Sequence, residues 1–247
     1  MIKYIILGVI QGVSEFLPVS SSGHLVIAQK ILNIQQHLVA TSVVLHLGTL
    51  LAVVIFFRRD ILNLFKDLKL FGQLCAVTVI TGTIGVLGKD FFESLFSSAR
   101  IVAIAWVFTG IMLLVTKKFT QLNKDKLQTK DVFILGLAQG LAIIPGVSRS
   151  GVTISTLFFR KINRQLAFSV SFLVSIPIIL GAALLEARKI ESLGQQDIVN
   201  LAAGLIFSFI FGMIALLALR SVINKAKFYY FGYYCLFMAG AVLFFMK

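Results

Sequence analysis

Charged residues are scarce in this sequence, and acidic ones are the scarcest. Asp, Glu, Lys and Arg together make up 13% of the 247 residues, about half the share found in soluble domains. Residues with apolar side chains make up 58%. This composition excludes an ordinary soluble domain and indicates an integral membrane protein.

Long basic segments are also missing, although Lys and Arg outnumber Asp and Glu by 23 to 10. The basic residues lie in short loops between apolar runs, and no basic tail follows them. That distribution argues against nucleic acid as a partner. It is typical of cytoplasmic loops and of contact with anionic membrane lipids.

Cysteine is nearly absent, and the start of the chain lacks the pattern of a cleaved leader. Cys75 and Cys235 both lie inside apolar runs. Their spacing excludes a zinc site or a disulfide framework, so we expect two buried small hydrophobic side chains. Gln11 and Glu15 interrupt the first apolar run, and no basic segment precedes it, so we expect this run to belong to the mature protein.

Six apolar runs are long enough to cross a bilayer as helices, which takes about 17 to 25 residues each. They are 38–57, 70–89, 99–116, 165–186, 198–219 and 227–246. Two further apolar regions, 4–32 and 131–159, are broken at "LPVSSSG" and "IPGVSRSG". Since each half of a broken region is too short to cross alone, these regions predict re-entrant helical hairpins.

The basic loops orient this arrangement. Lys and Arg are concentrated in 58–69, 117–130, 160–164 and 220–227. With both hairpins re-entrant, these four loops fall on one side of the membrane, which the positive-inside rule assigns to the cytoplasm. The sequence therefore predicts an all-α polytopic membrane protein with six transmembrane helices, two re-entrant hairpins and both termini outside.

The two broken segments are copies of one another. A shift of 128 residues places "LGVIQGVSEFLPVSSSG" at 7–23 over "LGLAQGLAIIPGVSRSG" at 135–151 without a gap, with eight identical residues in seventeen. The chain is then a single membrane domain, 1–247, built from repeat halves of approximately 1–120 and 129–247. Each half has one hairpin and three spans, so an inverted-topology repeat follows, with a polar site where the tips meet.

The copies differ at positions that carry chemistry. Glu15 stands opposite Ile143 in the second copy, and Ser21 stands opposite Arg149. His24 is likewise present in the first copy alone. We therefore expect the two similar hairpins to form an asymmetric site.

The second tip is suited to binding phosphate. Arg149 is flanked by Ser148 and Ser150, and Gly146 and Gly151 allow close approach of the backbone. A helix that begins near Ser150 would add free backbone N–H groups to the guanidinium and the hydroxyls. The alternative is that Arg149 pairs with Glu15 and only locks the hairpins together.

The first tip supplies candidate nucleophiles. Ser20, Ser21 and Ser22 form a cluster of hydroxyls at a helix start. Ser21 and His24 are three residues apart and share a face of a helical first turn. A hydroxyl beside an imidazole is the minimum for an activated nucleophile, and attack by the imidazole itself is the alternative. Both possibilities stay open at this point.

Glu15 is the one carboxylate within an apolar stretch. It lies four residues after Gln11, on the same face of the preceding helix. We expect Glu15 to orient His24 or to act as an acid or base. His46 lies in the middle of an apolar run, so we expect it to form a hydrogen bond between packed helices. A catalytic role is the alternative. Pro177 is expected to kink its run, because it has no N–H to donate.

The paired motifs "QGVSEFLPVSSSGH" and "PGVSRSG" resemble those of the undecaprenyl-diphosphate phosphatases, also called the bacitracin-resistance family. The resemblance extends over essentially the whole chain. It implies a multi-pass protein of the bacterial cytoplasmic membrane with its active site facing outward. It also implies removal of the terminal phosphate of the C55 isoprenoid diphosphate, which recycles the lipid carrier for peptidoglycan synthesis and confers bacitracin resistance.

The resemblance assigns roles to residues of both tips. The catalytic residues would be Ser21, His24, Glu15 and Arg149. The substrate-binding residues would be Gln11, Ser20, Ser22, Ser148, Ser150, Gly146 and Gly151. The family is helped by Mg²⁺ or Ca²⁺, but Gln11 stands where other members carry a second Glu. One carboxylate is a poor dedicated metal site, so we expect such an ion to reach Glu15 through the substrate diphosphate.

A transporter is the alternative function, because inverted repeats with broken hairpins are familiar in secondary transporters. The chain would then flip a lipid phosphate or move a small anion, with Arg149 as the anion site. The expected partners are a polyprenyl diphosphate and membrane lipids. Whether two copies form a homodimer is left open by the sequence.

Overall fold

The computed structural model describes residues 1–34, 37–95, 98–187, 190 and 193–245. Within these residues the regular elements are helices, apart from one isolated β-bridge between Lys124 and Ile162. In chain order the helices are α1 (Ile2–Phe16), α2 (Ser21–Ile31), α3 (Leu38–Phe56), α4 (Arg58–Leu64), α5 (Leu68–Leu87), α6 (Lys89–Leu95), α7 (Ala99–Val115), the 3-10 turn η1 (Thr116–Lys118), α8 (Thr129–Leu141), α9 (Arg149–Phe159), α10 (Arg164–Leu173), α11 (Ser175–Ala187), α12 (Gln195–Asn224) and α13 (Tyr230–Phe245).

Five helical segments in the described part of the chain are long and apolar enough to cross a membrane. They are Leu38–Phe56, Leu68–Leu87, Ala99–Lys118, Arg164–Ala187 and Gln195–Asn224. The sixth expected run is α13, which has 16 residues and falls just below the length of a typical span. The chain is thus an all-helical, multi-pass membrane protein.

The segment Arg164–Ala187 is not one continuous helix. It ends as α10 at Leu173 and resumes as α11 at Ser175. Pro177 has no N–H to donate to the carbonyl of Leu173, four residues earlier, and its ring crowds that carbonyl. The expected kink at Pro177 is confirmed as this break.

The two broken regions fold as pairs of short helices. α1 ends at Phe16 and α2 begins at Ser21, while α8 ends at Leu141 and α9 begins at Arg149. The starts of α2 and α9 are separated by the repeat spacing, and both helices have 11 residues. A helix of that length rises about 16 Å, roughly half the hydrocarbon thickness of a bilayer. In each pair a non-helical segment joins the two short helices.

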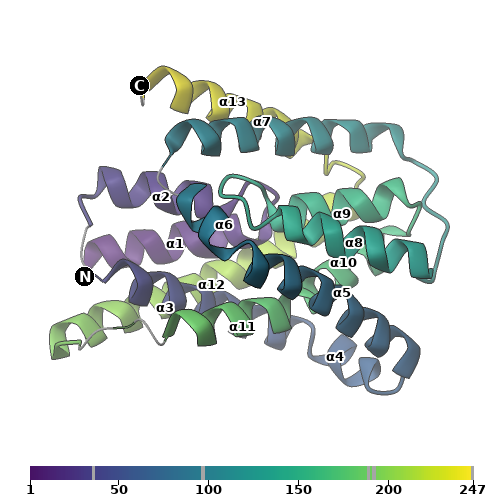
Figure 1. The fold of residues 1–247 in the computed structure, drawn as a ribbon, viewed down its shortest axis with the longest axis horizontal. Coiled ribbons are helices and arrows are strands. Elements are labelled where there is room, and N and C mark those ends of the chain that lie inside the picture. Colours follow the sequence, from purple (N-terminus) through teal and green to yellow (C-terminus); the bar gives the residue numbers. More distant parts are fainter. Residues whose placement is uncertain (35–36, 96–97, 188–189, 191–192, 246–247) are drawn as a thin grey trace.

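Each hairpin packs against a long helix from the other half of the chain. α1 lies along α12 and α8 lies along α5, while α7 lies beside α13 (Figure 1). The contact of α1 with α12 is close because Gly12 has no side chain: a Cβ there would lie 2.6 Å from the carbonyl oxygen of Ser208. Small residues of this kind allow membrane helices to approach closely.

The two cysteines differ in burial. Cys235 of α13 is buried, but Cys75 is exposed on α5. The prediction of a buried Cys75 was wrong. A membrane helix carries apolar residues on its outer surface as well as its packed one, so an apolar run does not identify the buried positions.

Candidate active site

The tips of the two hairpins meet, as the repeat predicts. The Nη2 atom of Arg149 donates to Oε1 of Glu15 across 2.7 Å. The backbone N–H of Gly146 donates to the hydroxyl of Ser22 across 3.5 Å. Residues more than 120 positions apart in the chain are thereby joined in one site.

Helix α7 supports both tips from one side. Trp106, which is fully buried, donates its Nε1–H to the carbonyl of Val19 across 2.7 Å. One turn along, the hydroxyl oxygen of Thr109 accepts the N–H of Ser148 at 3.2 Å. Since buried backbone groups need partners, these bonds fix both non-helical turns.

Each tip turns through a residue in the left-handed region. Ser20 has a φ of 68° and Gly146 a φ of 93°. Gly146 suits its position, because a Cβ there would lie 2.5 Å from the carbonyl oxygen of Val102 on α7. Ser20 is a non-glycine in this conformation, which is the kind of backbone strain found at functional sites. Its hydroxyl accepts the N–H of Gly23 and caps α2.

Glu15 is the centre of the hydrogen-bond network. Its Oε1 pairs with Arg149, and its Oε2 accepts the hydroxyl proton of Ser21 at 2.6 Å. Oε2 also accepts from Nε2 of Gln11 at 3.2 Å. The side chain is only 7% exposed, so the guanidinium charge and these donors replace the water that a carboxylate would otherwise bind. Ser21 is therefore aimed at a base, which is what a nucleophilic hydroxyl requires.

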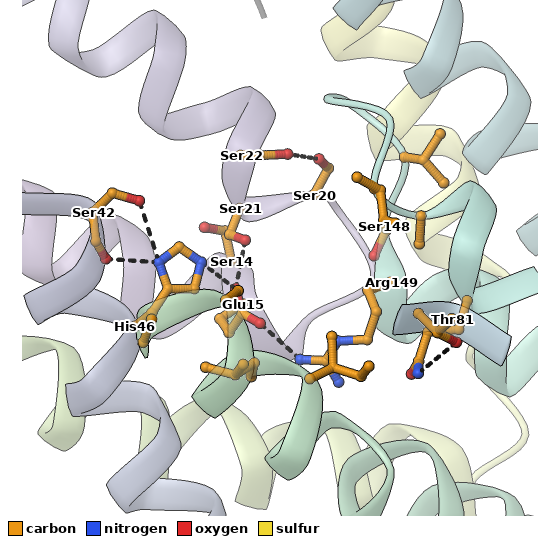
Figure 2. Close-up of a pocket in the computed structure, with 18 of the residues that line it drawn as sticks. Ser14, Glu15, Ser20, Ser21, Ser22, Ser42, His46, Thr81, Ser148 and Arg149 are labelled. Atoms are coloured by element: carbon orange, nitrogen blue, oxygen red, sulfur yellow. Dashed lines mark hydrogen bonds and ion pairs between the residues drawn. The ribbon is translucent and has the colours of Figure 1, made fainter. Parts of the chain in front are cut away.

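A cavity of about 290 Å³ opens beside this network. Its polar wall carries hydroxyl, amide, imidazole and charged groups (Figure 2). They belong to Ser14, Glu15, Ser20, Ser21, Ser22, Ser42, His46, Thr81, Gln139, Ser148, Arg149 and Glu186. Its apolar wall consists of Val43, Ala142, Ile143, Val147, Ile178, Ile179, Ala182 and Ala183. A ligand with a charged head and an apolar tail fits such a lining.

Arg149 uses only part of its hydrogen-bonding capacity within the site. It pairs with Glu15 through Nη2, as the alternative reading of the sequence expected. Its buried Nη1 has no hydrogen-bond partner among the described residues, and its guanidinium lies 5.7 Å from the ring centroid of Phe172. Two fixed contacts hold the cation while Nη1 is free to bind an anionic oxygen. The ion pair therefore leaves one guanidinium nitrogen of the same side chain without a partner among the described residues.

Four predicted substrate-binding residues lie behind the cavity wall. Gln11 and Ser150 are fully buried, and Ser150 bonds the hydroxyl of Ser148 at 3.3 Å. The N–H of Gly151 donates to the same Ser148 hydroxyl at 3.1 Å, and Gly146 packs on α7. These four residues do not line the cavity. They support the residues that do, because the turn at each tip is held in place by contacts behind the cavity wall.

His24 is not in the cavity, and the expected pairing of His24 with Ser21 and Glu15 is wrong. Its Nδ1 lies 2.7 Å from the carbonyl oxygen of Ser20 and its Nε2 lies 2.7 Å from the hydroxyl of Tyr234. Since a carbonyl only accepts, Nδ1 carries the proton and Nε2 accepts from the tyrosine. The ring is stacked on Tyr234 and edge-on to Trp106. Trp106 of α7 and Tyr234 of α13 hold the imidazole in an aromatic slot, and it does not contact Ser21.

His46 takes the place expected for His24. It lines the cavity, and its Nε2 lies 3.7 Å from Oε2 of Glu15 (Figure 2). The sequence interpretation gave it a packing role. A usable signal was present: at the repeat spacing His46 stands opposite Val174, the same kind of polar-against-aliphatic difference that marks Glu15 and Ile143.

The family model for bacitracin resistance protein BacA matches residues 4–242. The chain belongs to this family. It is 41% identical over 241 residues to an undecaprenyl-diphosphatase of Halothermothrix orenii, covering 94% of this chain and 93% of that protein. It is 37% identical over 237 residues to an undecaprenyl-diphosphatase of Thermotoga maritima, covering 95% and 96%. The resemblance inferred from the two motifs is confirmed.

The BacA-family chain does not present a dedicated metal site in the part that the structure describes. No group of three or more His, Cys, Asp or Glu side chains converges there. Both oxygens of Glu15 are already bonded within the site. Divalent cations such as Mg²⁺ and Ca²⁺ need several oxygen ligands, so the protein side chains alone do not fit one.

Proposed function

We propose that this BacA-family protein hydrolyses undecaprenyl diphosphate to undecaprenyl phosphate and inorganic phosphate. The observation that carries the proposal is the hydrogen bond of 2.6 Å from the Ser21 hydroxyl to Glu15, in a cavity that also holds Arg149. The names of the relatives point to the same substrate. The reaction would return the lipid carrier for peptidoglycan synthesis, and it would underlie bacitracin resistance.

In the first step, the oxygen of Ser21 attacks the terminal phosphorus as its proton passes to Oε2 of Glu15. The bond between phosphorus and the bridging oxygen breaks, and undecaprenyl phosphate leaves with the electron pair. Arg149 binds the equatorial oxygens through Nη1 and stabilises the charge that spreads over them. The hydroxyls of Ser20 and Ser148, which also line the cavity, orient the phosphoryl group.

In the second step, water attacks the phosphoserine. The bond from phosphorus to the Ser21 oxygen breaks, the serine recovers a proton, and inorganic phosphate departs. Glu15 acts in both steps. It receives a proton as a base in the first step and returns it as an acid in the second. His24 holds the carbonyl of Ser20 and thereby positions the adjacent Ser21, rather than touching the substrate.

A divalent cation enters through the substrate in this proposal. Mg²⁺ usually binds one or two carboxylates together with substrate phosphates. We propose that Mg²⁺ or Ca²⁺ would arrive on the diphosphate and would neutralise part of its charge, and that Glu15 would offer it a carboxylate at the junction of the tips. The support is the donor set, which is short of oxygen ligands until a diphosphate adds its own.

We also propose that α13 is a sixth span and that both hairpins are re-entrant, in inverted halves of approximately 1–120 and 129–247. The packing supports this: α1 lies on α12 and α8 lies on α5, and the repeat spacing relates these two pairs. The basic loops then face the cytoplasm of a bacterial cell, and the cavity opens toward the outer face.

Phosphate release in detergent tests the proposal against a transporter. Purified protein should release phosphate from a C55 or C15 isoprenyl diphosphate in micelles, and Ser21→Ala should release none above background. Ser94→Ala, at an exposed position on α6, is the matched control and should behave as wild type. Lipid-phosphate translocation in sealed vesicles without hydrolysis in micelles would instead establish the transporter.

A further inference from the structure

We propose that Gln139 of α8 positions the water molecule that hydrolyses the phosphoserine. The inference rests on the proposed function and deepens it, because it concerns the second chemical step alone. Gln139 is not among the residues to which the resemblance gives a role. Three observations carry the inference: an unpaired oxygen, the fixed orientation of the amide, and a place across the site from the nucleophile.

Gln139 carries one of two unpaired polar atoms in the lining of the cavity. Five buried side-chain atoms have no hydrogen-bond partner among the described residues. Of these five, two belong to lining residues, namely Nη1 of Arg149 and Oε1 of Gln139. Gln139 is only 1% exposed. A buried polar atom without a protein partner normally binds water or a ligand, so each of the two atoms calls for an occupant of the cavity.

The orientation of the Gln139 amide is fixed from α5. Its Nε2 donates to the hydroxyl oxygen of Thr81 across 3.2 Å (Figure 2). That hydroxyl in turn donates to the carbonyl oxygen of Gly136 across 3.1 Å, so its oxygen is the acceptor for the amide. Close packing keeps the pair together, since a Cβ on Gly136 would lie 2.8 Å from Cβ of Ile80 on α5. The amide nitrogen is therefore occupied, and the unpaired atom is the oxygen.

An unpaired amide oxygen suits water better than phosphate. It accepts hydrogen bonds and donates none. The oxygens of an ionised phosphoryl group also only accept, so they match the guanidinium of Arg149 and not Oε1 of Gln139. Water can donate to that oxygen. The two unpaired atoms together therefore fit a phosphoryl group with a water molecule beside it.

The position of Gln139 matches the direction from which water must come. Figure 2 shows Ser21 and Thr81 on opposite sides of the Arg149 side chain. Since Gln139 is bonded to Thr81, its amide approaches the phosphoryl site from the side away from the nucleophile. The attacking and leaving oxygens of a phosphoryl transfer lie roughly in line. Water therefore attacks opposite the Ser21 oxygen, on the face that undecaprenyl phosphate has left.

The internal repeat explains why two equivalent glutamines differ. Gln139 and Gln11 occupy the same position of the two copies. The amide of Gln11 donates to Glu15 across 3.2 Å. The second copy has Ile143 where the first has Glu15, so the amide of Gln139 bonds Thr81 instead. One glutamine thus supports the base, and the other is left with an oxygen for water.

The step balances without a further reactant. Oε1 of Gln139 accepts one hydrogen of the water, which directs a lone pair of the water oxygen at phosphorus. A bond forms between that oxygen and phosphorus, and the bond from phosphorus to the Ser21 oxygen breaks with its electron pair. Glu15 gives the Ser21 oxygen the proton that it took in the first step. Phosphate leaves as H₂PO₄⁻ with both protons of the water, and the amide neither gains nor loses a proton.

The test compares Gln139→Met with Gln73→Met in the full-length protein in detergent micelles. Methionine keeps the length and the unbranched shape of glutamine but removes the amide. Gln73 is the matched control, because it lies on α5 and donates its amide to the carbonyl of Leu127 across 3.1 Å without lining the cavity. A C15 isoprenyl diphosphate labelled in its terminal phosphate is added, and the reaction is quenched with sodium dodecyl sulfate at neutral pH after increasing times. Isoprenyl monophosphate, inorganic phosphate and label on the protein are measured separately.

A selective loss of the second step supports the inference. Gln139→Met should form the first equivalent of isoprenyl monophosphate at the wild-type rate, while phosphate release slows about 10- to 100-fold, the usual cost of misplacing a reactant. The fraction of protein labelled on Ser21 should rise above that of wild type. Thr81→Val, which removes the hydroxyl that orients the amide, should show the same pattern more weakly, and it serves if Gln139→Met does not fold. Gln73→Met should match wild type.

Three results overturn the inference. Wild-type kinetics in Gln139→Met would show that the water does not need the amide. Equal slowing of both products, without extra label on Ser21, would place Gln139 in the first step or in the fold alone. Phosphate release without a labelled protein in any variant would leave no phosphoserine for the water to attack. If wild-type protein releases no phosphate, it is the proposed function that fails.

Discussion

Replacing Glu15 with Gln removes one charge from the centre of the site while keeping its shape. The pair of Glu15 with Arg149 is short, at 2.7 Å, and the two side chains are only 7% and 15% exposed. Removing one partner of a buried ion pair leaves the other charge unpaired and costs about 3 to 5 kcal/mol. The slight exposure of Arg149 places our expectation at the lower end, about 3 kcal/mol.

Activity should fall for a separate reason. The amide of Gln does not accept a proton as a carboxylate does, so Ser21 loses its base, and the loss of a general base lowers kcat about 10²- to 10⁴-fold. Phosphate release from a C15 isoprenyl diphosphate and thermal unfolding in the same detergent measure the two effects. The control is the double variant Glu15→Gln/Arg149→Gln, which removes both charges.

The double variant separates stability from catalysis. It should unfold at a higher temperature than Glu15→Gln, because no unpaired charge is left buried, yet it should remain inactive. The reasoning is refuted if Glu15→Gln keeps wild-type kcat. It is refuted equally if the double variant is less stable than Glu15→Gln alone, since the ion pair would then not be the source of the loss.

Three further outcomes follow from the packing and the donor set. Gly12→Ala should lower the unfolding temperature, because its Cβ would lie 2.6 Å from the carbonyl oxygen of Ser208. The control Gly72→Ala should not, because nothing lies within 4 Å of the added carbon. Equal unfolding temperatures of the two variants would contradict the close contact of α1 with α12. Trp106→Phe should cost about 1 to 3 kcal/mol of stability by leaving the carbonyl of Val19 unpaired, and an unchanged unfolding midpoint would show that water replaces the indole. Calorimetric titration should detect Mg²⁺ binding to the protein in the presence of a non-hydrolysable isoprenyl diphosphate and none in its absence; saturable binding to the protein alone would contradict entry of the ion on the substrate.

The location of the site was predictable because burying its charged residues in an apolar segment costs free energy. Glu15 and Arg149 are charged groups within apolar segments, and the hydrocarbon region excludes such groups unless partners satisfy them. The repeat then predicted that the two tips are partners. The ion pair between them, which the sequence offered as the alternative to a free phosphate-binding Arg149, is present at 2.7 Å.

The choice of histidine was not predictable from local spacing. Ser21 and His24 are neighbours on a helical turn, but Trp106 of α7 and Tyr234 of α13 form the slot that binds the His24 ring. Those partners lie far along the chain, and spacing within a motif carries no information about them. His46 enters the cavity for the converse reason: α3 packs against α1 and α11, so its polar side chain faces Glu15.

The identity of the nucleophile is the central claim, and trapping of the phosphorylated protein tests it most directly. Purified wild-type protein is mixed with an isoprenyl diphosphate labelled in its terminal phosphate and quenched with sodium dodecyl sulfate at neutral pH. Separate portions are treated with acid or with alkali, and the labelled peptide of a digest is identified by mass spectrometry. We expect an acid-stable label on Ser21 and no label in Ser21→Ala. An acid-labile, base-stable label on His24 or His46 would contradict it, because the phosphoryl group would then have passed to an imidazole.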